Sequence, residues 1–229
     1  MEKAKKYYAY SIEMKGMTTA LLVVAIALFG PLIIFSRDII IEASSSPFFV
    51  VAIAFWFVLH EIIHGLSYRM SSGIGNQDIV FGAKLEKGVL FCVCKKPISK
   101  KDTIRSLLTP LVILGFATLI LGVAFHSDLL IVLSLMNICG ASGDILMALF
   151  IAGMPKDVRF FEDEQNRFVL VTGENISKRT AVGVKLEEIG DDYEKVLNKN
   201  TKKIIISKGS CIIIGVICLY TVLCILQVF

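Results

Sequence analysis

The sequence predicts an all-α integral membrane bundle of about five transmembrane helices, with small cytoplasmic β-hairpin elements. The first observation behind this prediction is composition: the 229 residues are 55% hydrophobic, and their mean hydropathy is +0.72. Soluble domains are usually less apolar than this. The second observation is that five stretches are long enough to cross a bilayer as helices, since each crossing needs roughly 20 apolar residues. These stretches are residues 17–35, 47–68, 107–125, 129–154 and 210–229.

The third observation is the distribution of positive charge between the predicted spans. Residues 1–16, 69–106 and 155–209 carry 4, 8 and 11 of the 24 lysines and arginines, and the opposite connections carry only Arg37. Cytoplasmic connections are enriched in Lys and Arg. We therefore expect a multi-pass protein of the cell membrane with its N-terminus in the cytoplasm and its C-terminus outside. The net charge of +4 then reflects topology and contact with anionic lipid, so no nucleic-acid partner is expected.

Residues 1–154 form the predicted transmembrane core, which holds four of the spans and a cytoplasmic hairpin over residues 72–98. Short β-branched and aromatic runs bounded by glycine favour strands in this hairpin, with a turn near Glu86-Lys87-Gly88. The hairpin directly follows the second span on its cytoplasmic side. We expect either an edge strand that pairs with an extended peptide by strand addition, or a plain connecting loop.

Residues 155–209 form a small cytoplasmic segment, which is followed by the fifth span at residues 210–229. Two short apolar runs in this segment predict a second hairpin, and residues 185–197 predict a short amphipathic helix on the membrane surface. Its glycines are isolated, so there is no phosphate-cradling motif. No nucleotide is therefore expected as a partner.

The motif His60-Glu61-Ile62-Ile63-His64 ends the apolar run of the second predicted span. Residues four apart share one face of a helix, so both imidazoles can reach one metal ion. Glu61, next to the first histidine, can deprotonate a metal-bound water. A charged residue inside lipid is costly and favours a functional role; the alternative is a chance motif whose side chains snorkel or pair at a helix end. The motif predicts a Zn²⁺ site with His60 and His64 as ligands.

A catalytic zinc site needs a third protein ligand beside an open position. Residues 107–125 contain no Asp, Glu, His or Cys, and the fourth span has one acid well inside its apolar run, Asp144. At 1.5 Å per residue, Asp144 lies at a depth similar to that of the motif histidines. We expect Asp144 to be the third ligand, the alternative being a structural polar residue paired with Arg105 or a backbone group. His126, predicted on the outer side, is expected to be a solvated loop residue.

Asn137 lies on the same helix face as Asp144, two turns away along the span. Its amide can hold a substrate backbone or stabilise an oxyanion, or it can join two helices by a hydrogen bond. Cys92 and Cys94 have a C-x-C spacing, but no second Cys or His pair completes a zinc site. We therefore expect these two cysteines to be ordinary strand residues.

These motifs resemble those of the site-2 protease family of intramembrane zinc metalloproteases, and more closely its small bacterial branch of zincin peptidases. The resemblance rests on His60-Glu61-Ile62-Ile63-His64-Gly65, on Gly143-Asp144 and on Pro155-Lys156-Asp157, and it covers roughly residues 47–165. It implies a bacterial source. It also implies that the motif histidines and the later Asp hold zinc and that the motif Glu is the catalytic base.

The function expected from these residues and this resemblance is a membrane-embedded zinc metallopeptidase. It would hydrolyse peptide bonds of membrane-protein or membrane-proximal peptide substrates from within the lipid bilayer. One alternative is a catalytically inactive zinc-binding regulator, or pseudoprotease, that binds a membrane partner. A zinc transporter or sensor fits less well, because the third and fifth spans offer almost no polar lining for a path.

Overall fold

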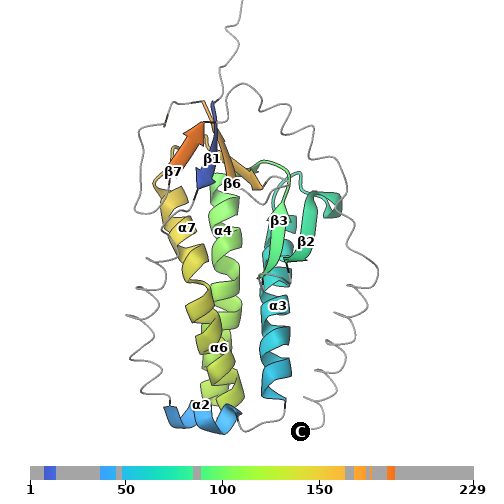
Figure 1. Cartoon of the computed structure of the whole chain (residues 1–229), viewed down its shortest axis with the longest axis vertical. Helices are drawn as coiled ribbons and strands as arrows, with labels where there is room; N and C mark the ends of the chain where they lie inside the picture. The colour runs from blue at the N-terminus through green and yellow to red at the C-terminus, as the bar shows by residue number, and fades with distance from the viewer. Residues whose placement is uncertain are drawn as a thin grey trace, which may run out of the picture.

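The computed structural model describes residues 8–13, 37–44, 48–84, 89–162, 168–173, 176 and 185–188. The predicted spans at residues 17–35 and 210–229 lie outside the described residues. Long helices run along the long axis of the molecule, and a β-sheet lies across one end of them (Figure 1). A short helix, α2 (Arg37–Ser44), lies across the opposite end.

Two long helical rods carry two of the predicted spans. The first is α3 (Phe49–Arg69). The second begins as α4 (Lys100–Pro110), passes through the π-helical segment η3 (Leu111–Ala117) and ends as α5 (Thr118–Ala124). Both rods are long and apolar enough to cross a membrane by length and composition. The second rod starts before the expected boundary, at Ser99, whose side chain accepts a hydrogen bond from the backbone N–H three residues on and so caps the helix.

The predicted span at residues 129–154 is divided into two helices, α6 (Asp128–Gly140) and α7 (Ser142–Ala152), which meet at a bend of 41°. Glycines flank the bend, and glycine weakens a helix interior. The two helices are long and apolar enough to span a membrane only when they are taken together, as one broken span or a re-entrant loop. The bend places Asp144 in the first turn of α7, instead of in the middle of a continuous helix.

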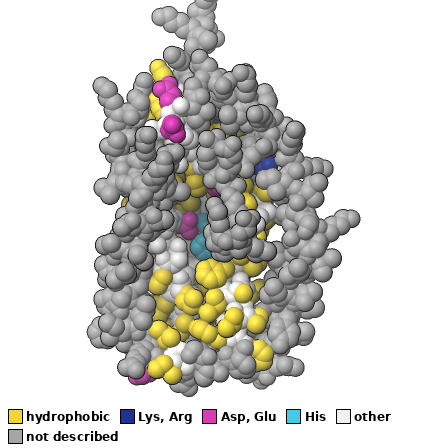
Figure 2. Space-filling model, in the orientation of Figure 1, with side chains coloured by type: hydrophobic (Ala, Val, Ile, Leu, Met, Phe, Trp, Pro, Cys, Tyr) yellow, Lys and Arg dark blue, Asp and Glu magenta, His cyan; other side chains and the backbone are white. Residues whose placement is uncertain are grey.

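The outer faces of these helices expose many large apolar side chains. Soluble monomers rarely expose contiguous apolar surface of this extent, and a helix that is apolar all round belongs in a core or in lipid. Hydrophobic side chains also cover much of the described surface in Figure 2. The most exposed include Val50, Phe57, Leu66, Val112, Phe116, Ile120, Val123 and Leu149. The described helices thus have the surface of a membrane-associated protein.

The larger sheet has five strands in the order β4-β5-β6-β1-β7, and each neighbouring pair is antiparallel. It joins segments that are far apart in the chain, so the described strands of residues 155–209 do not form a separate unit.

Strand β7 lies where we expected an amphipathic helix, and this expectation was wrong for residues 185–188. The reason is that pairing with β1 overrides the local sequence pattern. The strands are β1 (Tyr8–Glu13), β4 (Ile98–Ser99), β5 (Arg159–Glu162), β6 (Phe168–Thr172) and β7 (Lys185–Glu188).

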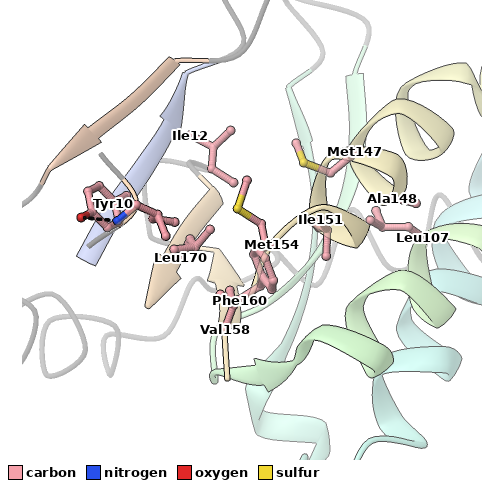
Figure 3. Close-up of a cluster of buried hydrophobic side chains, with 11 residues drawn as sticks. Tyr10, Ile12, Leu107, Met147, Ala148, Ile151, Met154, Val158, Phe160 and Leu170 are labelled. Carbon is pink, nitrogen blue, oxygen red and sulfur yellow. Dashed lines mark hydrogen bonds between the residues drawn. The ribbon is translucent and has the colours of Figure 1, made fainter. Parts of the chain in front are cut away.

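A cluster of buried apolar side chains joins this sheet to the ends of α4 and α7 (Figure 3). Tyr10 of β1, Phe160 of β5 and Leu170 of β6 are at most 1% exposed, and Ile151 of α7 is fully buried among them. The hydroxyl of Tyr10 accepts a hydrogen bond of 3.2 Å from the backbone N–H of Ile176, so its one polar atom is satisfied. The cluster fixes the relative position of the two helices that bring residues to the site described below.

A second, two-stranded sheet packs directly on α3. It consists of β2 (Ile79–Lys84), which follows the short 3₁₀ helix η1 (Asn76–Asp78), and β3 (Val89–Cys94), paired antiparallel within the region where we expect a hairpin. Phe81 and Cys92 are cross-strand partners, and both face Gly65 of α3. A Cβ atom at Gly65 would lie 2.3 Å from Cζ of Phe81 and 3.2 Å from Sγ of Cys92. The absence of a side chain at Gly65 is therefore what allows this close contact.

Candidate metal centre

Three side chains from two helices meet at one point between α3 and α7. The Nε2 atoms of His60 and His64 lie 3.0 Å apart. Oδ2 of Asp144 lies 3.3 Å from Nε2 of His60 and 3.4 Å from Nε2 of His64. Among the described residues, these three form the group of His, Cys, Asp and Glu side chains that could hold a metal ion. The structure thus brings together all three ligands predicted from the sequence.

Hydrogen bonds behind the imidazoles determine which nitrogen of each ring faces the centre. Nδ2 of Asn137 donates to the backbone carbonyl of Pro110 at 3.0 Å, which orients the amide, so its Oδ1 must accept the 2.8 Å hydrogen bond from Nδ1 of His60. Nδ1 of His64 donates to the backbone carbonyl of Ser106 at 2.8 Å. A neutral imidazole has one N–H. In their neutral form both rings therefore present an unprotonated Nε2 to the centre.

With both rings neutral, the centre contains three electron-pair donors and no hydrogen between them. Two imidazole lone pairs and one carboxylate oxygen at 3.0–3.4 Å from one another repel each other unless a cation lies among them. In a tetrahedral Zn²⁺ site with ligands at about 2.0–2.1 Å, neighbouring ligand atoms lie about 3.3 Å apart. Two His and one carboxylate is also a ligand set of catalytic zinc sites. The residues present therefore fit Zn²⁺ in ligand type, in protonation and in spacing.

Glu61, the predicted general base, lies beside the centre on the same helix as the two histidines. Its carboxylate is hydrogen-bonded to the backbone of Cys92 in β3. It also lines a pocket of about 180 Å³ together with His60 and Asn137, and the rest of the pocket wall is apolar, including Trp56 and Leu133. Figure 2 shows histidine and acidic side chains together near the middle of one face, with hydrophobic side chains below them. Glu61 and one of the candidate metal ligands, His60, thus line the same pocket.

Arg105, the alternative partner that the sequence left open for Asp144, makes other contacts. Nη2 of Arg105 donates to the backbone carbonyl of Ser67 at 3.2 Å and to Oγ of Ser71 at 3.0 Å. The same guanidinium forms an ion pair of 3.1 Å with Asp102. Arg105 therefore joins α4 to the end of α3, and Asp144 lies against the two histidines.

Three other predicted residues lie away from the centre. His126 is exposed in the turn after α5, with a φ of 53°. Cys92 and Cys94 are buried in β3 as free thiols, and burial raises the pKa of Cys94 to about 11 and that of Cys92 further. Such thiols are poor metal ligands and nucleophiles, because both roles need the thiolate.

Asn137 of α6 joins neighbouring helices by hydrogen bonds, which is one of the two roles expected from the sequence. Both ends of its amide are hydrogen-bonded behind the site, to His60 and to Pro110, and it is 6% exposed. These bonds give it the position of a residue that orients His60; its predicted role toward a substrate or an oxyanion stays a prediction. Sequence reasoning missed Ser106 and Pro110, because each acts through a backbone carbonyl that carries no residue-specific signal. The only available signal was a proline within a helical pattern.

The comparison with known families agrees with this geometry. Residues 53–159 match the model of a family described as "Putative zincin peptidase". This range contains the part of α3 that carries the motif, the sheet β2-β3 and the helix that carries Asp144. The similarity supports a zincin-like peptidase family and indicates a zinc metallopeptidase. Neither a curated protein nor a solved structure matches the chain.

Proposed function

We propose that this protein is a membrane-embedded zinc metallopeptidase that hydrolyses peptide bonds of membrane or membrane-proximal substrates. The observation that carries this proposal is the triangle of three lone-pair atoms from His60, His64 and Asp144, with edges of 3.0–3.4 Å. The similarity to zincin-like peptidases supports the same chemistry. The two apolar rods and the broken span α6–α7 support a site within the membrane.

The side chains around the centre have separate roles in the proposed reaction. When bound, Zn²⁺ supplies Lewis acidity, which polarises a carbonyl oxygen and lowers the pKa of water. Glu61 takes a proton from the attacking water and later gives it to the leaving amine, so it acts first as general base and then as general acid. Asn137 and the carbonyl of Ser106 keep the two imidazoles in the tautomer that offers Nε2.

The neighbouring elements support an extended peptide as substrate. In the described part of the chain β3 pairs with β2 on one side only, and its backbone at Cys92 contacts Glu61. A peptide added as a strand next to β3 would therefore pass beside the general base. The largely apolar pocket next to His60 and Glu61 suits an apolar side chain of that peptide. A substrate helix must unwind first, because helical amides already have their hydrogen bonds made.

The metal site is tested by elemental analysis of the detergent-purified protein. Wild type should contain about one zinc per chain, and His60→Ala and Asp144→Ala should both lose it. Asp128→Ala, which removes an acid at the other end of the α6–α7 pair, is the matched control and should keep its zinc. Absence of zinc in wild type after reconstitution with Zn²⁺ would overturn the proposal. Loss with His60→Ala alone would assign the third ligand to another residue.

The peptidase activity is tested with a trapped partner protein. Glu61→Gln should keep zinc and retain partners that wild type cleaves. The partner identified in this way is then incubated with wild-type protein in proteoliposomes, and a defined cleavage product is expected. Zinc retention together with an intact partner would instead favour the zinc-binding pseudoprotease.

A further inference from the structure

The acceptors that orient both histidines depend on one residue, Pro110, at the junction of α4 and η3. His64 is held by the backbone carbonyl of Ser106, and His60 is held by Asn137, which in turn is held by the carbonyl of Pro110. Ser106 and Pro110 are both less than 2% exposed. Water is thus kept away from these groups, and each hydrogen bond has to be made by the protein itself.

The first dependence follows from the atom that proline lacks. In an α-helix the carbonyl of residue 106 accepts the N–H of residue 110. Residue 110 is proline and has no N–H, so the carbonyl of Ser106 has no α-helical partner within α4. That carbonyl accepts the 2.8 Å hydrogen bond from Nδ1 of His64 instead. In return, Oγ of Ser106 donates to the backbone carbonyl of His64 at 3.2 Å, which joins α4 to α3 at this level.

The second dependence runs through the carbonyl of Pro110 itself. It accepts the hydrogen bond from Nδ2 of Asn137 in α6, and this bond turns Oδ1 of the amide toward His60. The π-helical segment η3 begins at the next residue, and such segments are often found at functional sites. Gly115 within η3 lets α6 approach: a Cβ there would lie 2.8 Å from Ile138 and 3.7 Å from Nδ2 of Asn137.

We propose that Pro110 is a positioning residue whose missing N–H sets the tautomer of His64, while the backbone carbonyl of the same residue orients the amide that accepts from His60. Its missing N–H frees the acceptor for His64, and its carbonyl holds the amide that accepts from His60. Without these two acceptors either ring can carry its proton on Nε2, which then cannot bind a metal. The proposal rests on the zinc site described above for its function, but the tautomers it assigns belong to the metal-free protein and can be measured there.

The experiment restores the missing N–H with Pro110→Ala in the full-length, detergent-solubilised protein. The chain has three histidines, so ¹⁵N-histidine labelling gives a spectrum that single histidine variants assign. At a pH where the imidazoles are neutral, metal-free wild type should show N–H on Nδ1 of His60 and His64. In Pro110→Ala, His64 should shift toward N–H on Nε2, while His60 should keep its tautomer because the carbonyl of residue 110 remains. His126, exposed in its turn, is the internal reference.

Two further readouts separate positioning from a purely structural role. Zinc affinity, measured by competition with a chelator, should fall about 10- to 100-fold in Pro110→Ala, as is typical for loss of an orienting partner. The unfolding temperature of the metal-free variant should not fall, because an N–H is added to a helix that lacked one. Pro97→Ala, which removes a proline just before β4, should change neither the tautomers nor the affinity.

Several results would overturn the proposal. It fails if His64 keeps its tautomer and zinc affinity is unchanged in Pro110→Ala. Pro110→Gly restores the same N–H without adding side-chain volume and serves as the second variant. If both variants fail to fold, the role of Pro110 is in the fold rather than in positioning, and the proposal is wrong. Absence of zinc from wild type would contradict the proposed function alone, since the tautomer measurement needs no metal.

Discussion

The metal centre and the core beneath the five-stranded sheet lie at neighbouring levels of the same helices but are built in opposite ways. The core is apolar: Tyr10, Ile151, Phe160 and Leu170 are almost completely buried and pack by shape. The centre is polar, and its imidazole and amide groups are held by hydrogen bonds of 2.8–3.0 Å to particular atoms: His60 to Asn137, His64 to Ser106 and Asn137 to Pro110. Apolar burial is non-directional, whereas hydrogen bonds require particular distances and angles.

The difference predicts that the two regions respond differently to substitution. Changes in the core should lower the free energy of unfolding while the folded molecules still bind zinc. Changes in the centre should alter zinc binding or turnover with little loss of stability, since three electron-pair donors facing one another do not stabilise the metal-free fold. The predictions below test this separation, from the largest expected effect to the smallest.

Glu61→Gln should lower the turnover of a defined peptide substrate about 10²- to 10⁴-fold, because general acid–base catalysis contributes this much. Its zinc content and unfolding temperature should stay at the wild-type values. Turnover per bound zinc is the measurement, and Glu187→Gln, an exposed acid on β7, is the matched control. Wild-type turnover in Glu61→Gln would exclude Glu61 as the general base.

Leu170→Ala should lower the free energy of unfolding by about 2–5 kcal/mol, because it leaves a cavity in the core. Leu170 is fully buried, whereas Leu149 is 64% exposed on α7, so Leu149→Ala is the control with the same chemical change and should cost much less. Chemical denaturation in detergent micelles gives both values. The zinc content of the folded fraction should be unchanged; zinc loss without loss of stability would contradict the separation of the two regions.

Gly65→Ala should destabilise the protein by about 1–3 kcal/mol, because the added Cβ overlaps the ring of Phe81 and forces β2-β3 away from α3. It should also reduce turnover, since the displaced β3 carries the backbone contact to Glu61. At Gly140 a Cβ would meet open space, so Gly140→Ala should not destabilise the protein. Equal stability of the two variants would show that the hairpin adapts without cost.

Ser106→Ala should cost about 1 kcal/mol of stability, the typical net value of one hydrogen bond. The lost bond is the one from its Oγ to the carbonyl of His64. Zinc affinity should change only a few-fold, because the backbone carbonyl that orients His64 remains in the variant. A loss of affinity as large as that expected for Pro110→Ala would mean that the hydroxyl, and not the carbonyl, positions the ring.

The pH dependence of stability should contain a small contribution from Cys94. Burial raises the pKa of this thiol from its ordinary value of 9.0 to about 11, so the folded state disfavours the thiolate. The stabilising contribution of the buried thiol should therefore be complete below about pH 9 and should be lost as the pH rises from about 9 toward 11. Unfolding free energies of wild type and Cys94→Ala should converge over this range. A constant difference would show that the thiol has the same pKa in the folded and unfolded states, as it would if Cys94 were exposed to water.

Different parts of the site could be predicted to different extents. His60, Glu61 and His64 are close in sequence, and helical periodicity alone places both histidines on one face. Asp144 is 80 residues further along than His64, but it could be chosen because few other ligands exist within the apolar spans. The orientation of His60 by Asn137 and the roles of Ser106 and Pro110 could not be predicted, since they depend on which helices touch and on which carbonyl lacks its helical partner.

The sequence by itself determined the apolar helices among the described residues, the His-Glu-x-x-His motif of the candidate zinc site and the acid that meets it, because composition, periodicity and residue chemistry are local properties. The tertiary structure decided the five-stranded sheet, in which residues 8–13 lie between strands from the other end of the chain, and the bend that brings Asp144 to the histidines. It also decided the proton positions on the imidazoles. Strand partners and hydrogen-bond acceptors are relations between distant segments, and no local pattern encodes them.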